Sequence, residues 1–121
     1  MWQDSYFLGF PFNLVFKTGM EINKHFPIPW CKKGIISACI IDDPTDGTMI
    51  FLDGQNNPGF SGGPIVIVDL DRKSRIIGVV SGYINDSEKK IPTPMGDLHT
   101  LENSGIVKAY SINHAIEIIK K

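Results

Sequence analysis

Seven short runs rich in Val, Ile and aromatic residues recur along the 121 residues, and Gly, Asn, Asp and Pro residues lie between many of them. β-branched and aromatic side chains fit the pleated surface of a sheet, and the residues between the runs favour turns. The pattern predicts an all-β domain, in which closing the strands into a barrel removes edges that would otherwise aggregate. The predicted strands cover residues 6–10, 14–17, 35–41, 49–52, 65–69, 76–83 and 106–110.

Two segments depart from this strand pattern. Residues 85–103 are polar and contain prolines, which favours a long surface loop over a core element. After Ser111, a residue suited to a helix N-cap, apolar side chains recur at helical spacing as far as Ile119. This spacing predicts a helix over about residues 112–120 that packs against the strands.

The charge and hydropathy of the chain give no sign of a nucleic-acid or membrane protein. The 12 basic and 13 acidic residues are intermixed and give a net charge of −1, so neither nucleic acid nor an anionic membrane is an expected partner. The longest apolar runs are far shorter than the ~20 residues that span a bilayer. No signal peptide is expected at the N-terminus, and the compartment stays open. The length suits one domain, residues 1–121.

The two cysteines, Cys31 and Cys39, are predicted to be free thiols, with a disulfide bond between them as the alternative. Cys31 follows Trp30 in an expected loop, whereas Cys39 lies within the apolar run 35–41 and is expected to be buried. The sequence has no CxxC motif and no Cys/His ligand spacing, so no metal site is expected.

Residues 59–64, Gly-Phe-Ser-Gly-Gly-Pro, place Ser61 between glycines just before an apolar run. A serine hydroxyl attacks a carbonyl only if it is exposed and if backbone N–H groups stabilise the developing oxyanion. Glycine permits positive φ angles and lets a substrate approach the main chain. The segment is therefore typical of a nucleophile loop, and a plain Gly-rich turn between two strands is the alternative.

Residues 56–66 resemble the nucleophile loop of trypsin-like serine peptidases, particularly of the HtrA-like bacterial branch. The resemblance implies a six-stranded antiparallel Greek-key barrel, the second half of a trypsin-like double barrel, followed by a short C-terminal helix. Four further segments resemble, in the same order, other strands and the terminal helix of that second barrel: residues 7–11 (Phe-Leu-Gly-Phe-Pro), 34–38 (Gly-Ile-Ile-Ser-Ala), 77–81 (Ile-Gly-Val-Val-Ser) and 105–115.

The resemblance also implies a role for individual residues. Ser61 takes the position of the catalytic nucleophile, and the backbone N–H groups of Gly59 and Ser61 take the positions of the oxyanion hole. Gln55 takes the position at the base of the specificity pocket, where a neutral side chain does not favour a basic substrate residue. The positions that bind an extended polypeptide substrate by strand addition fall to Ser81, Gly82 and Tyr83.

Two residues depart from the family's usual pattern. Phe60 stands where a small polar residue is usual, beside the nucleophile. Tyr83 stands where glycine is usual, and its ring is expected to narrow the pocket.

Members of this family carry the His and Asp of the catalytic triad ahead of the serine, on a first barrel. Only six residues precede Phe7 here, so the resemblance implies that both partners of Ser61 lie on a barrel missing from this chain. His25, His99 and His114 are each expected to be solvated or helix-face imidazoles. Of the three, His25 is the strongest alternative base.

Two classes of function follow. The first is a trypsin-like serine endopeptidase, of which this chain is the C-terminal barrel, hydrolysing polypeptides without a cofactor. The second is a non-catalytic relative that kept the fold and binds peptides or other proteins. In either case the chain alone is expected to have little or no peptidase activity. A separate N-terminal barrel or a second copy of the chain is the expected partner of its exposed flank.

Overall fold

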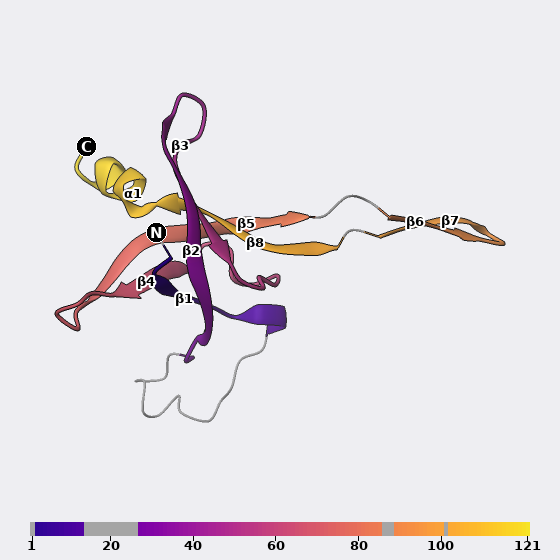
Figure 1. Ribbon diagram of the computed structural model, residues 1–121, viewed down its shortest axis with the longest axis horizontal. Coiled ribbons are helices and arrows are strands. Elements are labelled where there is room, and N and C mark those ends of the chain that lie inside the picture. The colour runs from indigo at the N-terminus through magenta and orange to yellow at the C-terminus, as the bar shows by residue number, and fades with distance from the viewer. Residues whose placement is uncertain (1, 14–26, 86–88, 101) are drawn as a thin grey trace.

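The computed structural model describes residues 2–13, 27–85, 89–100 and 102–121 (Figure 1). The predicted strand at 14–17 and His25 lie outside these residues. The prediction of a mostly antiparallel β domain with one short C-terminal helix is confirmed. The elements are β1 (Asp4–Gly9), the 3₁₀ helix η1 (Pro11–Asn13), β2 (Trp30–Asp43), β3 (Gly47–Asp53), β4 (Pro64–Val68), β5 (Ser74–Asn85), β6 (Lys89–Thr93), β7 (Gly96–Thr100), β8 (Asn103–Ser111) and α1 (Ile112–Ile119).

Six of the strands form one antiparallel sheet with the hydrogen-bonded order β1-β2-β3-β8-β5-β4. The first and last strands of this order also pair with each other, because Ser5 lies opposite Ile67 and Phe7 lies opposite Ile65. The sheet therefore closes on itself. β4 lies antiparallel between β1 and β5, so the segment before β4 lies near the end of β1 and beside the middle of β5, where Pro64 pairs with Val79.

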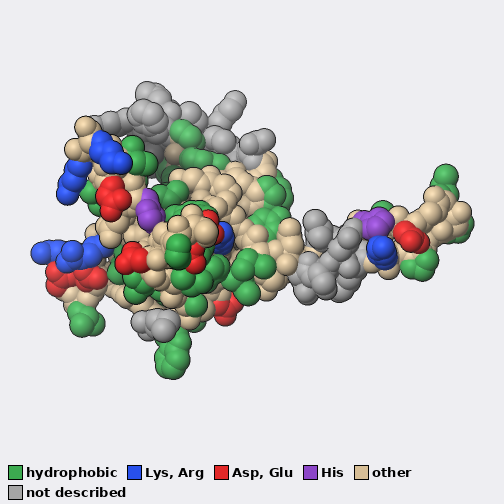
Figure 2. Space-filling view, turned by 90° about the horizontal axis from the view of Figure 1, so that it is seen from above, with side chains coloured by type: hydrophobic (Ala, Val, Ile, Leu, Met, Phe, Trp, Pro, Cys, Tyr) green, Lys and Arg blue, Asp and Glu red, His purple; other side chains and the backbone are tan. Residues whose placement is uncertain are grey.

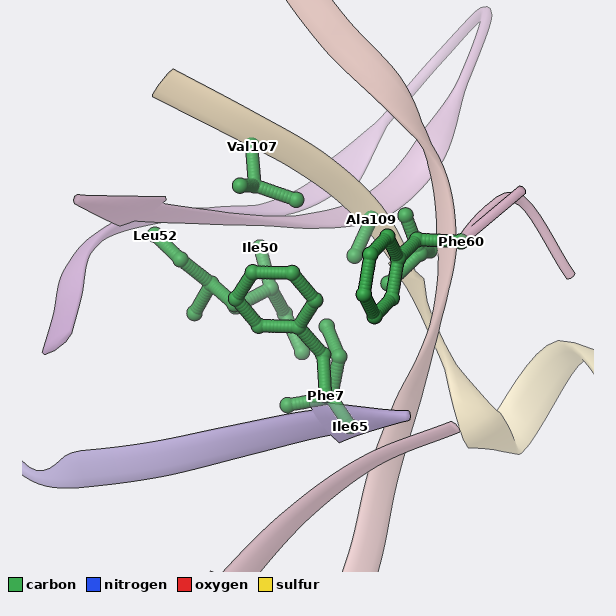
Figure 3. Close-up of a cluster of buried hydrophobic side chains, with 8 residues drawn as sticks. Phe7, Ile50, Leu52, Phe60, Ile65, Val107 and Ala109 are labelled. Atoms are coloured by element: carbon green, nitrogen blue, oxygen red, sulfur yellow. The ribbon is translucent and has the colours of Figure 1, made fainter. Parts of the chain in front are cut away.

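The core fills the inside of this closed sheet (Figure 3). Successive residues of a strand face opposite sides, so β1 buries Phe7 completely while its neighbours Tyr6 and Leu8 are only half-buried. Phe60 is also fully buried, although it belongs to no strand. The core cluster consists of Phe7, Ile50, Leu52, Phe60, Ile65, Val80, Val107 and Ala109.

β2 is longer than the predicted strand 35–41, and its second half leaves the closed sheet. The β1–β2 ladder ends at Ile35, and Ile36 still exchanges backbone hydrogen bonds with Trp2 and Gln3. Beyond Ile36, β3 is the only strand among the described residues that pairs with β2. With one paired side and no covering layer, the residues from Ser37 to Asp42 are exposed. Cys31 and Cys39 are both free thiols, as predicted. The expectation that Cys39 is buried is wrong, because it lies in this outer half of β2.

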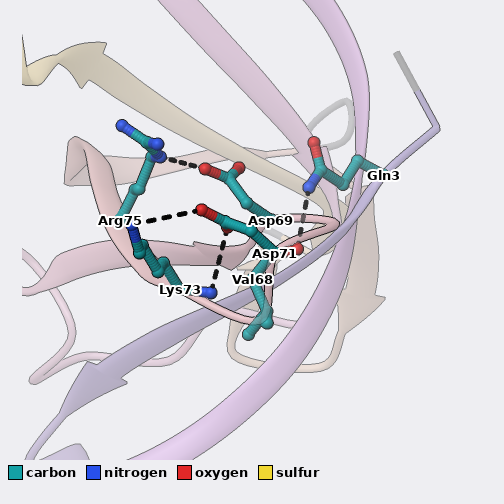
Figure 4. Close-up of polar contacts among 6 residues, drawn as sticks. All are labelled: Gln3, Val68, Asp69, Asp71, Lys73 and Arg75. Atoms are coloured by element: carbon teal, nitrogen blue, oxygen red, sulfur yellow. Dashed lines mark hydrogen bonds and ion pairs between the residues drawn. The ribbon is translucent and has the colours of Figure 1, made fainter.

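A polar turn joins β4 to β5 (Figure 4). The backbone N–H of Asp69 donates to the carbonyl of Lys73 at 2.8 Å, and the carboxylate of Asp69 accepts from Arg75. From β1's side, the amide of Gln3 donates to the carbonyl of Val68 at 3.3 Å. Exposed charge pairs of this kind contribute at most ~1 kcal/mol each, so the turn sets the register of the two strands more than their stability.

The described residues of the predicted surface loop 85–103 are exposed, apart from the half-buried Asn103, but they include two paired strands. β6 and β7 pair with each other, with Ile91 opposite Leu98, and Gly96 lies in their turn with φ of +118°. Figures 1 and 2 both show this hairpin lying away from the closed sheet. The residues described on it are exposed, which explains why its composition is that of a loop.

The C-terminal helix α1 covers Ile112–Ile119, within one residue of the prediction. Its N-cap is Ser111, whose hydroxyl accepts from the N–H of Asn113 at 3.3 Å. The helix contacts β5 and β8 but has no buried residue, so the expected packing is shallow. Among the described residues, no helix combines the length and the hydropathy that crossing a bilayer requires.

Leu52→Ala is predicted to lower the free energy of unfolding by about 2–5 kcal/mol, because it removes a fully buried side chain from the core. Leu70→Ala is the matched control, since Leu70 lies fully exposed in the β4–β5 turn and its loss is expected to change stability by less than about 0.5 kcal/mol. Urea unfolding of both variants measures the difference. Equal midpoints would contradict the placement of the core.

Candidate active site

Ser61 lies in the segment between β3 and β4, which contacts both neighbours of β4. On the β1 side, the N–H of Phe10 donates to the carbonyl of Gly59 at 2.9 Å. On the β5 side, Gly62 donates to Val80 at 2.7 Å, and Val80 donates back to Gly63 at 2.9 Å. These backbone hydrogen bonds fix the segment at both flanks of Ser61.

Two glycines of this segment adopt backbone angles that favour glycine. The φ angle is +103° at Gly59 and +84° at Gly62, which confirms the expectation from the sequence. At Gly59 a Cβ atom would also overlap the carbonyl oxygen of Phe10, whereas at Gly62 it would meet no atom within 4 Å. Gly63 is restricted differently, because a Cβ atom there would overlap the carbonyl oxygen of Leu8.

Phe60 anchors the segment in the core. Its ring packs edge-to-face on Phe7, with 5.2 Å between the ring centroids and 74° between the planes. Figure 3 shows both rings inside the closed sheet. The residues on either side of it, Gly59 and Ser61, are exposed. The departure from the family's small polar residue therefore has a structural consequence: an apolar anchor holds the candidate nucleophile at the surface.

The backbone N–H groups around Ser61 divide into paired and unpaired donors. Phe60 donates to the carbonyl of Asn57 at 3.4 Å, and Gly62 donates to Val80. Within the described part of the chain, the N–H groups of Gly59 and Ser61 have no protein acceptor. Both donors that the resemblance assigns to the oxyanion hole thus belong to exposed residues and have no acceptor among the described residues.

The structure brings Ser61 next to the strand expected to bind substrate. The Ser61 hydroxyl donates to the carbonyl of Ser81 in β5 at 3.2 Å. The β4–β5 ladder ends at Val79, and Val80 still exchanges hydrogen bonds with Gly62 and Gly63 of the loop. Beyond Val80, β8 is the only strand among the described residues that pairs with β5. Within these residues, the edge at Ser81, Gly82 and Tyr83 therefore has no strand beside it on the side of Ser61, and Tyr83 is half-buried opposite the buried Val107.

A pocket of about 400 Å³ lies beside Ser61 on the side of β1. Because β4 separates β1 from β5, this pocket and the unpaired edge of β5 flank the nucleophile loop from two sides. Backbone groups and apolar side chains make most of its walls. The lining residues are Leu8, Gly9, Phe10, Pro29, Gly59, Ser61, Gly62, Gly63 and Pro64.

Gln55 is exposed, and its backbone belongs to a polar network that the sequence did not reveal. The ammonium of Lys32 donates to the carbonyl of Gln55 at 2.7 Å and to the side chain of Asn57. Asn56 is buried, with 1% of its surface exposed, and its carbonyl accepts from the side chain of Asn103. The residues joined by the Lys32–Gln55 and Asn103–Asn56 bonds are 23 and 47 positions apart, so no local motif marks them.

No histidine contacts Ser61 within the residues that the structure describes. His114 uses Nε2 to accept from the N–H of Thr48 at 3.1 Å, and His99 lies on β7 in the outlying hairpin. His25 is outside the described residues, so its role as an alternative base stays a prediction. The described residues also hold no group of three or more His, Cys, Asp or Glu side chains placed to bind a metal ion.

Comparisons with models of protein families, with curated proteins and with solved structures gave no match to this chain. The assignment of roles to these residues therefore rests on the motif resemblance and on the geometry of the loop.

Substitution of the loop glycines by alanine is predicted to have graded effects on stability. Gly62→Ala imposes only a positive φ and is expected to cost about 1 kcal/mol, whereas Gly59→Ala adds a collision with the backbone and is expected to cost more. Gly82→Ala is the control, because its Cβ atom would meet nothing within 4 Å and no positive φ is involved. Thermal or urea unfolding gives the order. Three variants as stable as the parent would mean that the segment is a flexible turn.

Proposed function

We propose that this chain is the second barrel of a trypsin-like serine endopeptidase, with Ser61 as the nucleophile and the N–H groups of Gly59 and Ser61 as the oxyanion hole. The observation that carries the proposal is the arrangement around Phe60. A buried ring lies between two exposed residues, Gly59 and Ser61, whose N–H groups no protein acceptor within the described residues occupies. In enzymes of this chemistry each such donor contributes about 3 kcal/mol to stabilising the transition state.

The strand order supports the same proposal. Around the closed sheet the first four strands run β4-β1-β2-β3, so the fourth strand lies beside the first. This is the arrangement of a Greek key. The remaining two strands, β5 and β8, pair with each other and complete the ring. A six-stranded Greek-key barrel is what the resemblance to the second trypsin-like barrel implies.

The proposed substrate is an extended polypeptide that adds as a strand to the edge of β5 at Ser81, Gly82 and Tyr83. Main-chain hydrogen bonds at an unpaired strand edge bind peptides of many sequences, and side-chain pockets select among them. The proposal assigns selection at the cleaved bond to a pocket with Gln55 at its base. In this proposal the ring of Tyr83 narrows that pocket, which is distinct from the pocket on the side of β1.

The proposed reaction needs a general base that the described residues do not place at Ser61. A His oriented by an Asp would take the proton of the hydroxyl while its oxygen attacks the carbonyl carbon, and would then give that proton to the leaving amine. We assign both residues to a first barrel outside residues 1–121. No cofactor takes part in this mechanism.

The hydrogen bond from Ser61 to the Ser81 carbonyl favours a second candidate function. In this arrangement the hydroxyl is a donor to the backbone and is not activated by a base. The alternative is therefore a non-catalytic member of the fold that binds a peptide along the same edge of β5. It differs from the first proposal in one observable: Ser61 would not react with a serine-directed probe even when a base is supplied, although the peptide still binds.

We predict that a fluorophosphonate probe labels the purified chain weakly and labels it strongly when a first barrel bearing His and Asp is added in trans. Loss of a triad member costs several orders of magnitude in rate, so restoring the base should raise labelling by a similar factor. Ser61→Ala should abolish labelling. Ser37→Ala is the matched control, because Ser37 is also exposed and its hydroxyl, within the described residues, bonds to the carbonyl of Ile35.

Two other results would redirect the proposal. Strong labelling of the isolated chain that Ser61→Ala abolishes would place a base within the chain and point to His25. No labelling with the added barrel, together with peptide binding that Ser61→Ala leaves unchanged, would establish the non-catalytic alternative.

A further inference from the structure

Lys32 occupies a position where a lysine is unexpected. It lies directly opposite Phe7 in the β1–β2 pair, and residues directly opposite each other in an antiparallel pair share a face of the sheet. Because Phe7 is fully buried, the stem of Lys32 lies on the inner face, and the residue is half-buried. The next residue, Lys33, is exposed and forms an ion pair with Asp4 at 2.7 Å.

The ammonium of Lys32 contacts three residues of the nucleophile segment. It donates to the carbonyl of Gln55 at 2.7 Å and to the side-chain oxygen of Asn57, and it lies 5.3 Å from the centroid of the Phe60 ring. None of these partners is titratable. Burial lowers the pKa of Lys32, whereas the hydrogen bond from Lys33 to Asp4 raises the pKa of Lys33.

These contacts connect β2 to the segment that contains Ser61. Gln55 and Asn57 form the arm that leads from β3 into the loop, and Phe60 separates Gly59 from Ser61. Without the ammonium, the carbonyl of Gln55 and the amide oxygen of Asn57 would lose this donor at the end of the core. Gln55 is exposed and Asn57 is half-buried, so water can replace the ammonium at both oxygens. What is lost is the link between β2 and the arm, and the arm is then free to shift relative to the sheet.

We propose that Lys32 is a positioning residue for the nucleophile loop: from β2 it holds the arm at Gln55 and Asn57 and thereby fixes the backbone that presents Gly59 and Ser61. This inference rests on the proposed function only for the role of the loop; the coupling between Lys32 and the loop is a property of the folded chain. The sequence motif gives no sign of it, because β2 and the loop are separate segments.

The coupling can be measured without activity by NMR titration of the unmodified chain. Carbon-detected spectra follow the Cε signals of Lys32 and Lys33 and the carbonyl signals of Gly59 and Ser61 into the alkaline range, where amide protons exchange too fast to observe. Deprotonation of Lys32 weakens its bonds to the loop. We therefore expect the Gly59 and Ser61 signals to move with the Lys32 titration, which precedes that of Lys33.

Variants separate this role from simple packing. Lys32→Met keeps the stem and removes the donors, so it should displace the Gly59 and Ser61 signals at neutral pH and speed hydrogen exchange of the Gly62 N–H about tenfold. Lys32→Arg restores charge and donors and should return the signals toward those of the parent. Lys33→Met is the matched control from the same strand and should leave the loop unchanged.

Three results would overturn the inference: loop signals that ignore the Lys32 titration, a Lys32→Met spectrum that matches the parent at the loop, or an equal effect of Lys33→Met. If Lys32→Met does not fold, the NMR titration of the unmodified chain still tests whether Lys32 is coupled to the loop. Failure of the proposed function would be seen elsewhere, as a Ser61 that does not react with the probe when the first barrel is present, and it would leave these NMR results standing.

Discussion

The edge-to-face contact between Phe60 and Phe7 is the interaction on which the candidate site depends. It ties a loop residue to the first strand of the closed sheet, inside the core. A buried residue in a short loop forces its neighbours outward, so Gly59 and Ser61 reach the surface with their N–H groups unpaired within the described residues. The positive φ angles at Gly59 and Gly62 turn the backbone toward the core before Phe60 and back toward the surface after it. The exposed hydroxyl and the unpaired donors are thus consequences of packing.

Local sequence patterns predicted the strands of the closed sheet, because inward-facing apolar residues and turn residues are both visible locally. They failed where burial depends on distant partners. The run 35–41 has the composition of a core strand, yet beyond Ile36 only β3 pairs with β2 among the described residues, and Cys39 is exposed. Residues 85–103 have the composition of a loop, yet β6 and β7 pair within them. In the first case the composition indicated burial and the strand is exposed, and in the second it indicated exposure correctly but not the pairing. Both depend on which strands lie alongside, and local composition does not contain that information.

The candidate site also has a part that local motifs predicted and a part that depends on distant residues. The serine loop and the unpaired edge at Ser81 were predicted from motifs, and the structure brings them into contact. Phe60 was recognised only as a departure from a pattern, and its burial gives that departure a physical reason. Lys32 and Asn103 were missed, since their bonds to the loop connect residues far apart in the sequence. No fixed spacing in the sequence relates such residues to the loop, so they can be identified only from the structure.

An oxyanion hole and a general base place different demands on a fold. Backbone donors are positioned by the hydrogen bonds and packing of the segment that contains them, so one closed sheet with a rigid loop can present them by itself. A base must approach the hydroxyl from another element, and none of the histidines described here does so. In triad enzymes the donors and the binding surface retain part of the rate enhancement when a triad member is lost. In the proposed function, this chain therefore supplies the oxyanion-hole donors and the substrate-binding edge by itself. Catalysis begins only when another element brings the base to the hydroxyl.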